Sequence, residues 1–240
     1  MIVERIKRKI EPGLYIVPQS TPIIYFGNYD NAKACTISLN PSNKEFVYNK
    51  NELLDYRKKE RLCSRKILNK SDSDVLSADD AEIVLKYCKE CFYKNPFNTW
   101  FKPFNYFISQ YGGYSYYNGT CVHLDLVQWA TFEKWSKVPE NIKQLHIKND
   151  LPVLKYLLEK DFEIIFLNGE TTVNNVCNYL EIDIIKKPTI FTNINGSASN
   201  LIVYTGKYNK THIVGWNPYL QSAAVGGNEN KQILCNTIKK

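Results

Sequence analysis

Short β-branched and apolar runs alternate along the chain with segments whose apolar residues recur at helical spacing. Each run has the length of a strand and stops at polar or turn-forming residues, which predicts buried strands that lead into loops. The runs are Ala32–Leu39, Thr120–Val127, Glu163–Leu167 and Thr211–Trp216. A further pair, Thr189–Ile194 and Leu201–Thr205, flanks Asn195-Gly196-Ser197 and predicts a hairpin or strand pair.

Helical segments are expected between these strands. Ser77 is a typical N-cap residue for a helix whose apolar stripe comprises Ile83, Val84, Tyr87, Cys88, Cys91 and Phe92. A second helix is expected around Leu151–Lys160, and Thr171 predicts the start of a third that ends near Leu180. Strands that alternate with helices favour right-handed crossovers. The predicted fold is therefore a three-layer α/β/α domain with a central, mainly parallel, four-stranded sheet.

Loops that follow parallel strands gather at one edge of a sheet, and binding sites in such folds lie there. The four candidate loops are Asn40-Pro41-Ser42, the residues from Asp125 onward, Asn168-Gly169, and the residues from His212 onward. Their convergence predicts a functional site at the carboxyl ends of the strands.

Composition is that of a globular protein. The 240 residues suit one compact domain, and 44% hydrophobic with 23% charged residues excludes disordered and fibrous classes. No apolar run approaches the roughly 18–20 residues of a membrane span, and the N-terminal residues lack the apolar core of a signal peptide. We expect a single domain over residues 1–240, monomeric and cytoplasmic.

The charge balance is 31 basic against 24 acidic residues, a net charge of +7. This excess is compatible with a polyanion such as nucleic acid but does not identify one. The densest basic run, Tyr56–Arg61 with Arg65-Lys66, either contacts phosphates or forms a solvated helix face.

Cysteine and histidine spacing gives no metal site. Seven cysteines are an odd number, which favours reduced thiols over a disulfide framework. Cys88-x-x-Cys91 has ligand-like spacing but no matched second pair, and both residues lie on the apolar stripe of their helix. Core packing is therefore the favoured interpretation, and we expect neither a metal nor a cofactor.

Two loops and one strand together resemble the uracil-DNA glycosylase superfamily. The loops are Ser38–Ser42 and His212–Pro218, and the strand between them is His123–Leu126. The resemblance covers roughly Tyr25 to Gly227. It implies a uracil-DNA glycosylase-like fold, DNA as the partner, and a monofunctional enzyme that flips a base and hydrolyses its N-glycosidic bond.

The resemblance also implies roles for individual residues. Asn40 would position the hydrolytic water, and His212 would donate to the base O2, although Ile213-Val214-Gly215 replaces the Pro-Ser-Pro that follows this His in the family. Downstream of the first loop, Phe46 or Tyr48 would stack on the flipped base. The candidates for an apolar wedge in the minor groove are Trp216, Tyr219 and Leu220.

Two departures from the family's pattern concern the substrate base. Asp125 stands where uracil-cleaving members carry an Asn, and an ionised carboxylate accepts from the N4 amino group of cytosine but opposes the O4 of uracil. Ser42 stands where strict uracil enzymes carry a Tyr that blocks C5 substituents. Together they imply a C5-modified cytosine, such as 5-hydroxymethylcytosine or its glucosylated form, excised in anti-phage defence to leave an abasic site.

Other functions stay open on the sequence alone. A repair glycosylase for uracil or deaminated bases shares every motif, and a non-catalytic DNA-binding module fits the missing Pro-Ser-Pro. An unrelated small-molecule enzyme on a similar sheet would lack affinity for DNA. Each residue also has a structural interpretation: Asn40-Pro41 as a turn, His212 as a packed strand residue, Asp125 as a buried acceptor.

Overall fold

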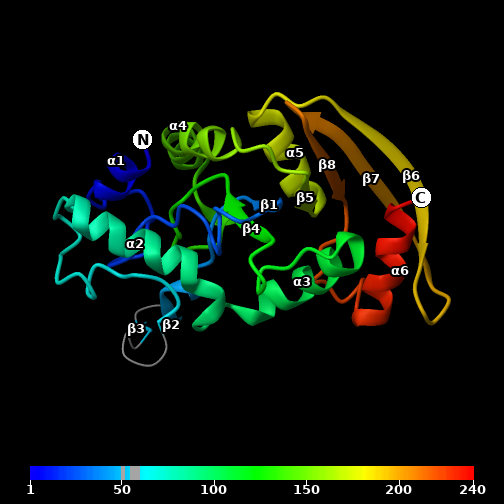
Figure 1. Cartoon of the computed structure of the whole chain (residues 1–240), viewed down its shortest axis with the longest axis horizontal. Coiled ribbons are helices and arrows are strands. Elements are labelled where there is room, and N and C mark those ends of the chain that lie inside the picture. Colours follow the sequence, from blue (N-terminus) through cyan, green and yellow to red (C-terminus); the bar gives the residue numbers. More distant parts are fainter. Residues whose placement is uncertain (50–51, 55–59) are drawn as a thin grey trace. The chain divides into compact units, whose positions relative to one another are not determined.

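The computed structural model of the chain describes residues 1–49, 52–54 and 60–240, and its elements are labelled in Figure 1. The chain divides into two compact units, each assembled from three segments. The first unit comprises Met1–Asn28, Leu39–Phe97 and Leu124–Glu159. The second unit comprises Tyr29–Ser38, Asn98–His123 and Lys160–Lys240.

The main sheet has six strands in the order β4-β1-β5-β8-β7-β6. They are β1 (Ala34–Ser38), β4 (Cys121–Asp125), β5 (Ile164–Asn168), β6 (Ile184–Thr192), β7 (Ala198–Tyr208) and β8 (Thr211–Trp216). β5 pairs in parallel with β1 and with β8, whereas β7 is antiparallel to both β8 and β6. The sheet belongs to the second unit, except that the last two residues of β4 count to the first.

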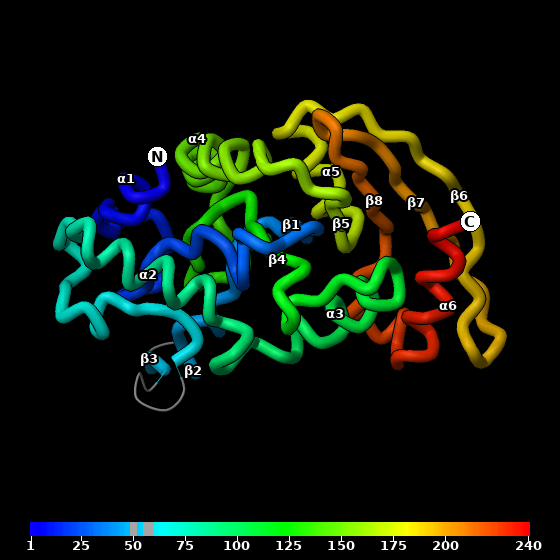
Figure 2. Tube along the Cα trace, in the orientation of Figure 1, coloured from blue at the N-terminus to red at the C-terminus, as the bar shows by residue number. Residues whose placement is uncertain are grey.

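The expected α/β class is confirmed, but the strand count of four is wrong. The four expected strands β4, β1, β5 and β8 do lie next to one another. The hairpin of β6 and β7 continues the same sheet beyond β8, as Figures 1 and 2 show. β6 is the outermost strand and most of its residues are exposed, including Ile185 at 71%. A strand buried on neither face carries no continuous apolar run, so its place in the sheet was not visible in the sequence.

Helices make up most of the remaining structure. In the second unit they are α3 (Asn98–Gly112), α5 (Glu170–Tyr179) and α6 (Asn228–Ile238). In the first unit they are α1 (Ile2–Lys7), α2 (Ala78–Glu90) and α4 (Glu140–Leu157), with 3₁₀ turns η1 (Asn43–Glu45), η2 (Cys91–Tyr93) and η3 (Trp135–Lys137). A small sheet of β2 (Val47–Asn49) and β3 (Glu52–Leu53) completes the first unit. Among the described residues, no helix has the length and apolarity needed to cross a bilayer.

The helix α2 begins as its sequence predicts. Ser77 Oγ accepts a hydrogen bond from the Asp80 amide at 3.0 Å, and the Asp80 carboxylate accepts one from the Ser77 amide at 2.8 Å. This reciprocal capping box satisfies two amides that the first turn leaves open. The predicted stripe is buried at Val84 and Cys88, but Ile83 is exposed.

One helix escaped sequence analysis and another was expected only in part, and each of them contains a proline. α3 contains Pro103, and α4 extends far upstream of the expected Leu151–Lys160 with Pro152 inside it. Proline removes one helical hydrogen bond and normally ends a helix. In α3, burial of Phe104 and Phe107 stabilises the helix despite this loss.

The central strands of the second unit are covered on both faces. The ring of Phe107 on α3 lies 4.3 Å from that of Trp216 on β8, measured between centroids. Gly215, the preceding residue of β8, points the opposite way, toward Val173 on α5. A Cβ at Gly215 would lie only 2.6 Å from Val173 Cγ2, so the absence of a side chain lets α5 approach the sheet.

Replacing Gly215 with Ala should therefore destabilise the fold by about 1–3 kcal/mol, because the added methyl overpacks the α5 interface. The measurement is the free energy of unfolding from urea titration. Gly227→Ala is the matched control: nothing lies within 4 Å of its Cβ, and it should cost less than about 1 kcal/mol. Equal losses in the two variants would contradict this account of the packing.

Candidate active site

Asn40 is held in a fixed orientation within the first unit. Its Nδ2 donates to Thr131 Oγ1 at 3.1 Å and to the Pro41 carbonyl at 3.2 Å. Thr131 Oγ1 in turn donates to the Glu133 carbonyl at 2.8 Å. Because both amide hydrogens are engaged, the Asn40 carbonyl oxygen is the atom left to accept a hydrogen bond. The side chain can thus orient a water molecule.

Backbone pairing brings the two strand-end segments of this site together. The Val127 amide donates to the Leu39 carbonyl at 2.9 Å, which ties the loop after β1 to the segment after β4. Thr131 forms an isolated antiparallel bridge with Ile16. Main-chain contacts at Val127 and at Thr131 itself therefore fix the position of Thr131, the residue that accepts from the Asn40 amide.

A small cavity of about 90 Å³ opens beside Asn40. Its lining includes Pro41, Ser42, Thr131, Glu133 and Trp135. A water takes up about 30 Å³ in the liquid, so the cavity accommodates a few water molecules next to the Asn40 amide. Ser42 has a structural task as well, because its Oγ accepts from the Lys44 amide at 3.2 Å and caps η1.

Two buried carboxyl groups of the first unit lie close enough to interact electrostatically. Glu45 and Asp125 are each 4% exposed. Burial raises the pKa of Glu45 from 4.5 to about 8; Arg61 opposes this rise and the charge of Asp125 adds to it. At neutral pH Glu45 is therefore mostly protonated, and its carboxyl group is a hydrogen-bond donor beside the Asp125 carboxyl.

The segment that carries Glu45 is anchored on both sides. Arg61 donates from Nε to the Lys44 carbonyl at 3.0 Å, and the Leu54 amide donates to the Phe46 carbonyl at 2.8 Å. Phe46 is buried and lines a narrow pocket together with Glu45 and Arg61. Phe46 thus lies with Glu45 at this pocket, whereas Tyr48 is 40% exposed.

Gln128 is a buried polar side chain next to this group. It is 1% exposed, and its Nε2 donates to the Asp125 carbonyl at 3.3 Å. Its Oε1 accepts no hydrogen bond from any residue within the described ranges. A buried acceptor without a donor is costly, and a ligand that donates to it would remove that cost.

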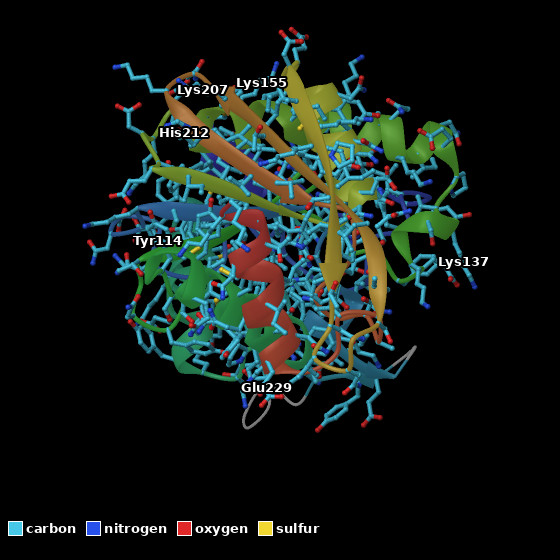
Figure 3. The ribbon with its side chains drawn as sticks, turned by 90° about the vertical axis from the view of Figure 1, so that its right-hand side faces the viewer. Tyr114, Lys137, Lys155, Lys207, His212 and Glu229 are labelled. Carbon is cyan, nitrogen blue, oxygen red and sulfur yellow. The ribbon has the colours of Figure 1, made fainter. Side chains whose placement is uncertain are left out.

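His212 does not begin a loop at the carboxyl end of its strand. It is the second residue of β8 and pairs with Ile164, the first residue of β5, whereas Trp216 pairs with Asn168, the last. On the adjacent strand β7, Lys207 pairs with His212, and Figure 3 shows the two residues side by side. The expected position of His212 is therefore wrong, because β8 begins at Thr211 and carries His212 at its amino end.

Two of the three wedge candidates are buried. Trp216 is 0% exposed and packs on Phe107, and Leu220 is 1% exposed, so neither can insert into DNA as the structure stands. The expectation that they form a wedge is wrong, because both belong to the core of the second unit. Tyr219 is half-buried over Gly169, where an added Cβ would lie 2.4 Å from its ring. It remains a candidate.

Asn168 organises the loop that follows β8. It is fully buried, and its Oδ1 accepts from Trp216 Nε1 at 3.1 Å and from the Leu220 amide at 3.0 Å. Its Nδ2 donates to Gln221 Oε1 at 2.9 Å. These three hydrogen bonds of the Asn168 side chain hold Trp216 and the loop that follows it, which makes Asn168 a structural residue.

The remaining polar candidates are structural or lie outside the described residues. Arg65 is fully buried and donates to the carbonyls of Arg8, Ser71 and Asp74, so it does not contact phosphates. Of the basic run, Tyr56–Lys59 falls outside the described residues. All seven cysteines are free and buried. Within the described ranges, His, Cys, Asp and Glu side chains form no metal-binding cluster.

Sequence reasoning missed Glu45 and Thr131. Glu45 is one acidic residue in a polar stretch, and only its burial next to Asp125 makes it unusual. Thr131 lies 91 residues from Asn40, so no local pattern connects them. The geometry defines an α/β protein with a fixed amide, a small cavity beside that amide, and two buried carboxyl groups, those of Glu45 and Asp125. No family model, curated protein or solved structure matches this chain.

The raised pKa of Glu45 predicts how stability depends on pH. The folded protein keeps a proton on Glu45 that the unfolded chain releases, so the free energy of unfolding should fall as pH rises from about 4.5 to about 8. Urea titrations across this range measure the slope, which Glu45→Gln should reduce. Glu82→Gln, on the exposed face of α2, should leave it unchanged. An unaltered slope in Glu45→Gln would refute the assignment.

Proposed function

We propose that this chain is a monofunctional DNA glycosylase of the uracil-DNA glycosylase superfamily. It flips a C5-modified cytosine, such as 5-hydroxymethylcytosine or its glucosylated form, and hydrolyses the N-glycosidic bond to leave an abasic site. It acts as a cytoplasmic monomer in defence against phages and needs no cofactor. The observation that supports the proposal is the fixed Asn40 side-chain amide. Its carbonyl oxygen is the atom that would orient a water molecule.

The first step of the reaction is the departure of the base. Breaking the bond develops positive charge on the sugar and negative charge on the base, and a donor held in a dry site stabilises the latter. The neutral amide of Asn40 orients the attacking water but is not a strong base. The N-glycosidic bond therefore breaks before the water attacks. Thr131 is a positioning residue that holds the amide.

The coupled carboxyl groups supply the contacts to the base. The protonated Glu45 donates to the base oxygen, which is the role that the resemblance implies for His212. Asp125 accepts from the N4 amino group. This pair of one donor and one acceptor complements cytosine. The O4 of uracil would meet the Asp125 acceptor instead, at a cost of about 1–3 kcal/mol.

Other features support a DNA substrate. Ser42 is small and half-buried at the Asn40 cavity, which leaves room near C5 of the base. Phe46, beside Glu45, is the aromatic side chain for stacking, and Tyr219 is the wedge. The adjacent strands β4, β1, β5 and β8 suit the uracil-DNA glycosylase-like architecture, and the net charge of +7 favours a polyanion.

The decisive experiment uses matched duplexes that carry uracil, cytosine, 5-hydroxymethylcytosine or its glucosylated form. Base release is scored by mass spectrometry and abasic sites by alkaline cleavage. We expect release of a modified cytosine, reduced on the order of 100-fold by Asn40→Ala, since the water loses its orientation. Asn141→Ala, an exposed asparagine of α4, should keep full activity.

Two other outcomes would contradict the proposal. Release of uracil alone would identify a repair enzyme and remove the role of Asp125. DNA binding without release from any duplex, in wild type and Asn40→Ala alike, would identify a non-catalytic module.

A separate prediction distinguishes the two candidate donors to the base. Glu45→Ala should lower the rate of base release by at least about tenfold, because the leaving base loses its donor. His212→Ala should change it by less than about twofold, because His212 lies exposed at the amino end of β8. Circular dichroism of both variants checks that they fold. A large loss in His212→Ala with full activity in Glu45→Ala would reverse these roles.

A further inference from the structure

A second cavity of the first unit shares no lining residue with the cavity beside Asn40. It has a volume of about 570 Å³ and is lined by α1, the segment that follows it, α4 and Trp129. Ligand sites for small molecules have volumes of roughly 300–1,000 Å³. None of the residues proposed above for base release lines it.

Arg5 forms the fixed cationic part of this cavity. It is 5% exposed, forms an ion pair with the fully buried Asp150, and lies over Trp129 with its guanidinium carbon 5.4 Å from the ring centroid. Asp150 is held in turn by the Gln128 amide, which donates to its Oδ2 at 2.8 Å. The Nε–H of Arg5 is buried and has no hydrogen-bond partner among the described residues.

A second guanidinium, that of Arg8, adds to the positive charge of the cavity. Arg8 lies close enough to Arg5 to lower its pKa, although burial is the larger cause and Asp150 opposes both. Lys7 pairs with Glu4 at 3.0 Å, and Lys9 lies 3.8 Å from Glu11. Within the described part of the chain no acidic side chain pairs with Arg8, so the cavity keeps an excess positive charge.

The other walls of the cavity are apolar or neutral. Leu14, Ile16 and Val75 line it, together with the Trp129 ring. His146 also lines it, and its Nε2 donates to the Leu14 carbonyl at 2.7 Å. Burial lowers the pKa of His146, so the imidazole stays neutral and adds no charge. The cavity therefore combines two guanidinium groups with a body of apolar surface.

We propose that this cavity binds a free mononucleotide-sized ligand that carries a phosphate group. The phosphate accepts from the Nε–H of Arg5 and pairs with Arg8, which relieves both the unsatisfied donor and the repulsion of two like charges. The apolar part of the ligand packs against the aliphatic wall formed by Leu14 and Val75. The site is independent of the proposed glycosylase activity.

The test is isothermal titration calorimetry of the full chain with adenosine monophosphate at low salt. Binding is expected, and adenosine or inorganic phosphate alone should bind at least about tenfold more weakly, because each supplies half of the contacts. Arg8→Gln should weaken binding of the monophosphate by about tenfold or more. Lys148→Gln, an exposed cation of α4 outside the cavity lining, is the matched control and should bind as wild type.

The proposal would be overturned by the absence of any heat of binding at millimolar ligand, by equal affinity in Arg8→Gln, or by equal affinity for inorganic phosphate. Displacement of the nucleotide by a short single-stranded oligonucleotide in an Arg8-dependent manner would assign the cavity to DNA and also overturn it. Base release by Arg8→Gln, expected at the wild-type rate, separates failure of this site from failure of the glycosylase.

Discussion

The parallel pairing of β5 with β1 and β8 is the constraint on which the second unit depends. It aligns Trp216 with Asn168 at the carboxyl ends and leaves His212 at the amino end of β8. The Asn168 side-chain amide then accepts a hydrogen bond from the Trp216 indole and donates one to Gln221 in the loop beyond it. A shift of one residue would turn Trp216 away from α3 and break this arrangement, since successive side chains face opposite sides.

In the first unit, burial changes the protonation of Glu45. Glu45 and Asp125 are both buried, and burial raises the pKa of Glu45 to about 8, so Glu45 is mostly protonated at neutral pH. Glu45 can then donate a hydrogen bond, which an ionised carboxylate in water cannot do. The same unit pairs the buried Arg5 with the fully buried Asp150.

Much of the fold was predictable because local patterns and burial agree. The strands β1, β4 and β5 are buried along their whole length and β8 is buried except at His212, so their sequences are mostly apolar or β-branched. The capping box at Ser77 is equally local. The exposed β6, and the helices α3 and α4 with their internal prolines, contradict the local rules and are stabilised by packing instead. The sequence therefore predicted only part of β6, as Thr189–Ile194, and part of α4, as Leu151–Lys160, and missed α3.

For the candidate site, the sequence by itself determined that Asn40 follows a buried strand and that Asp125 ends another. Both facts depend on residues within a few positions of each other. Only the tertiary structure decided that Thr131 holds the Asn40 amide, that Glu45 is buried with a raised pKa, and that Trp216 belongs to the core. Those facts arise from contacts between segments far apart in the chain. Burial and charge coupling are properties of the folded surroundings, which no single stretch of sequence contains.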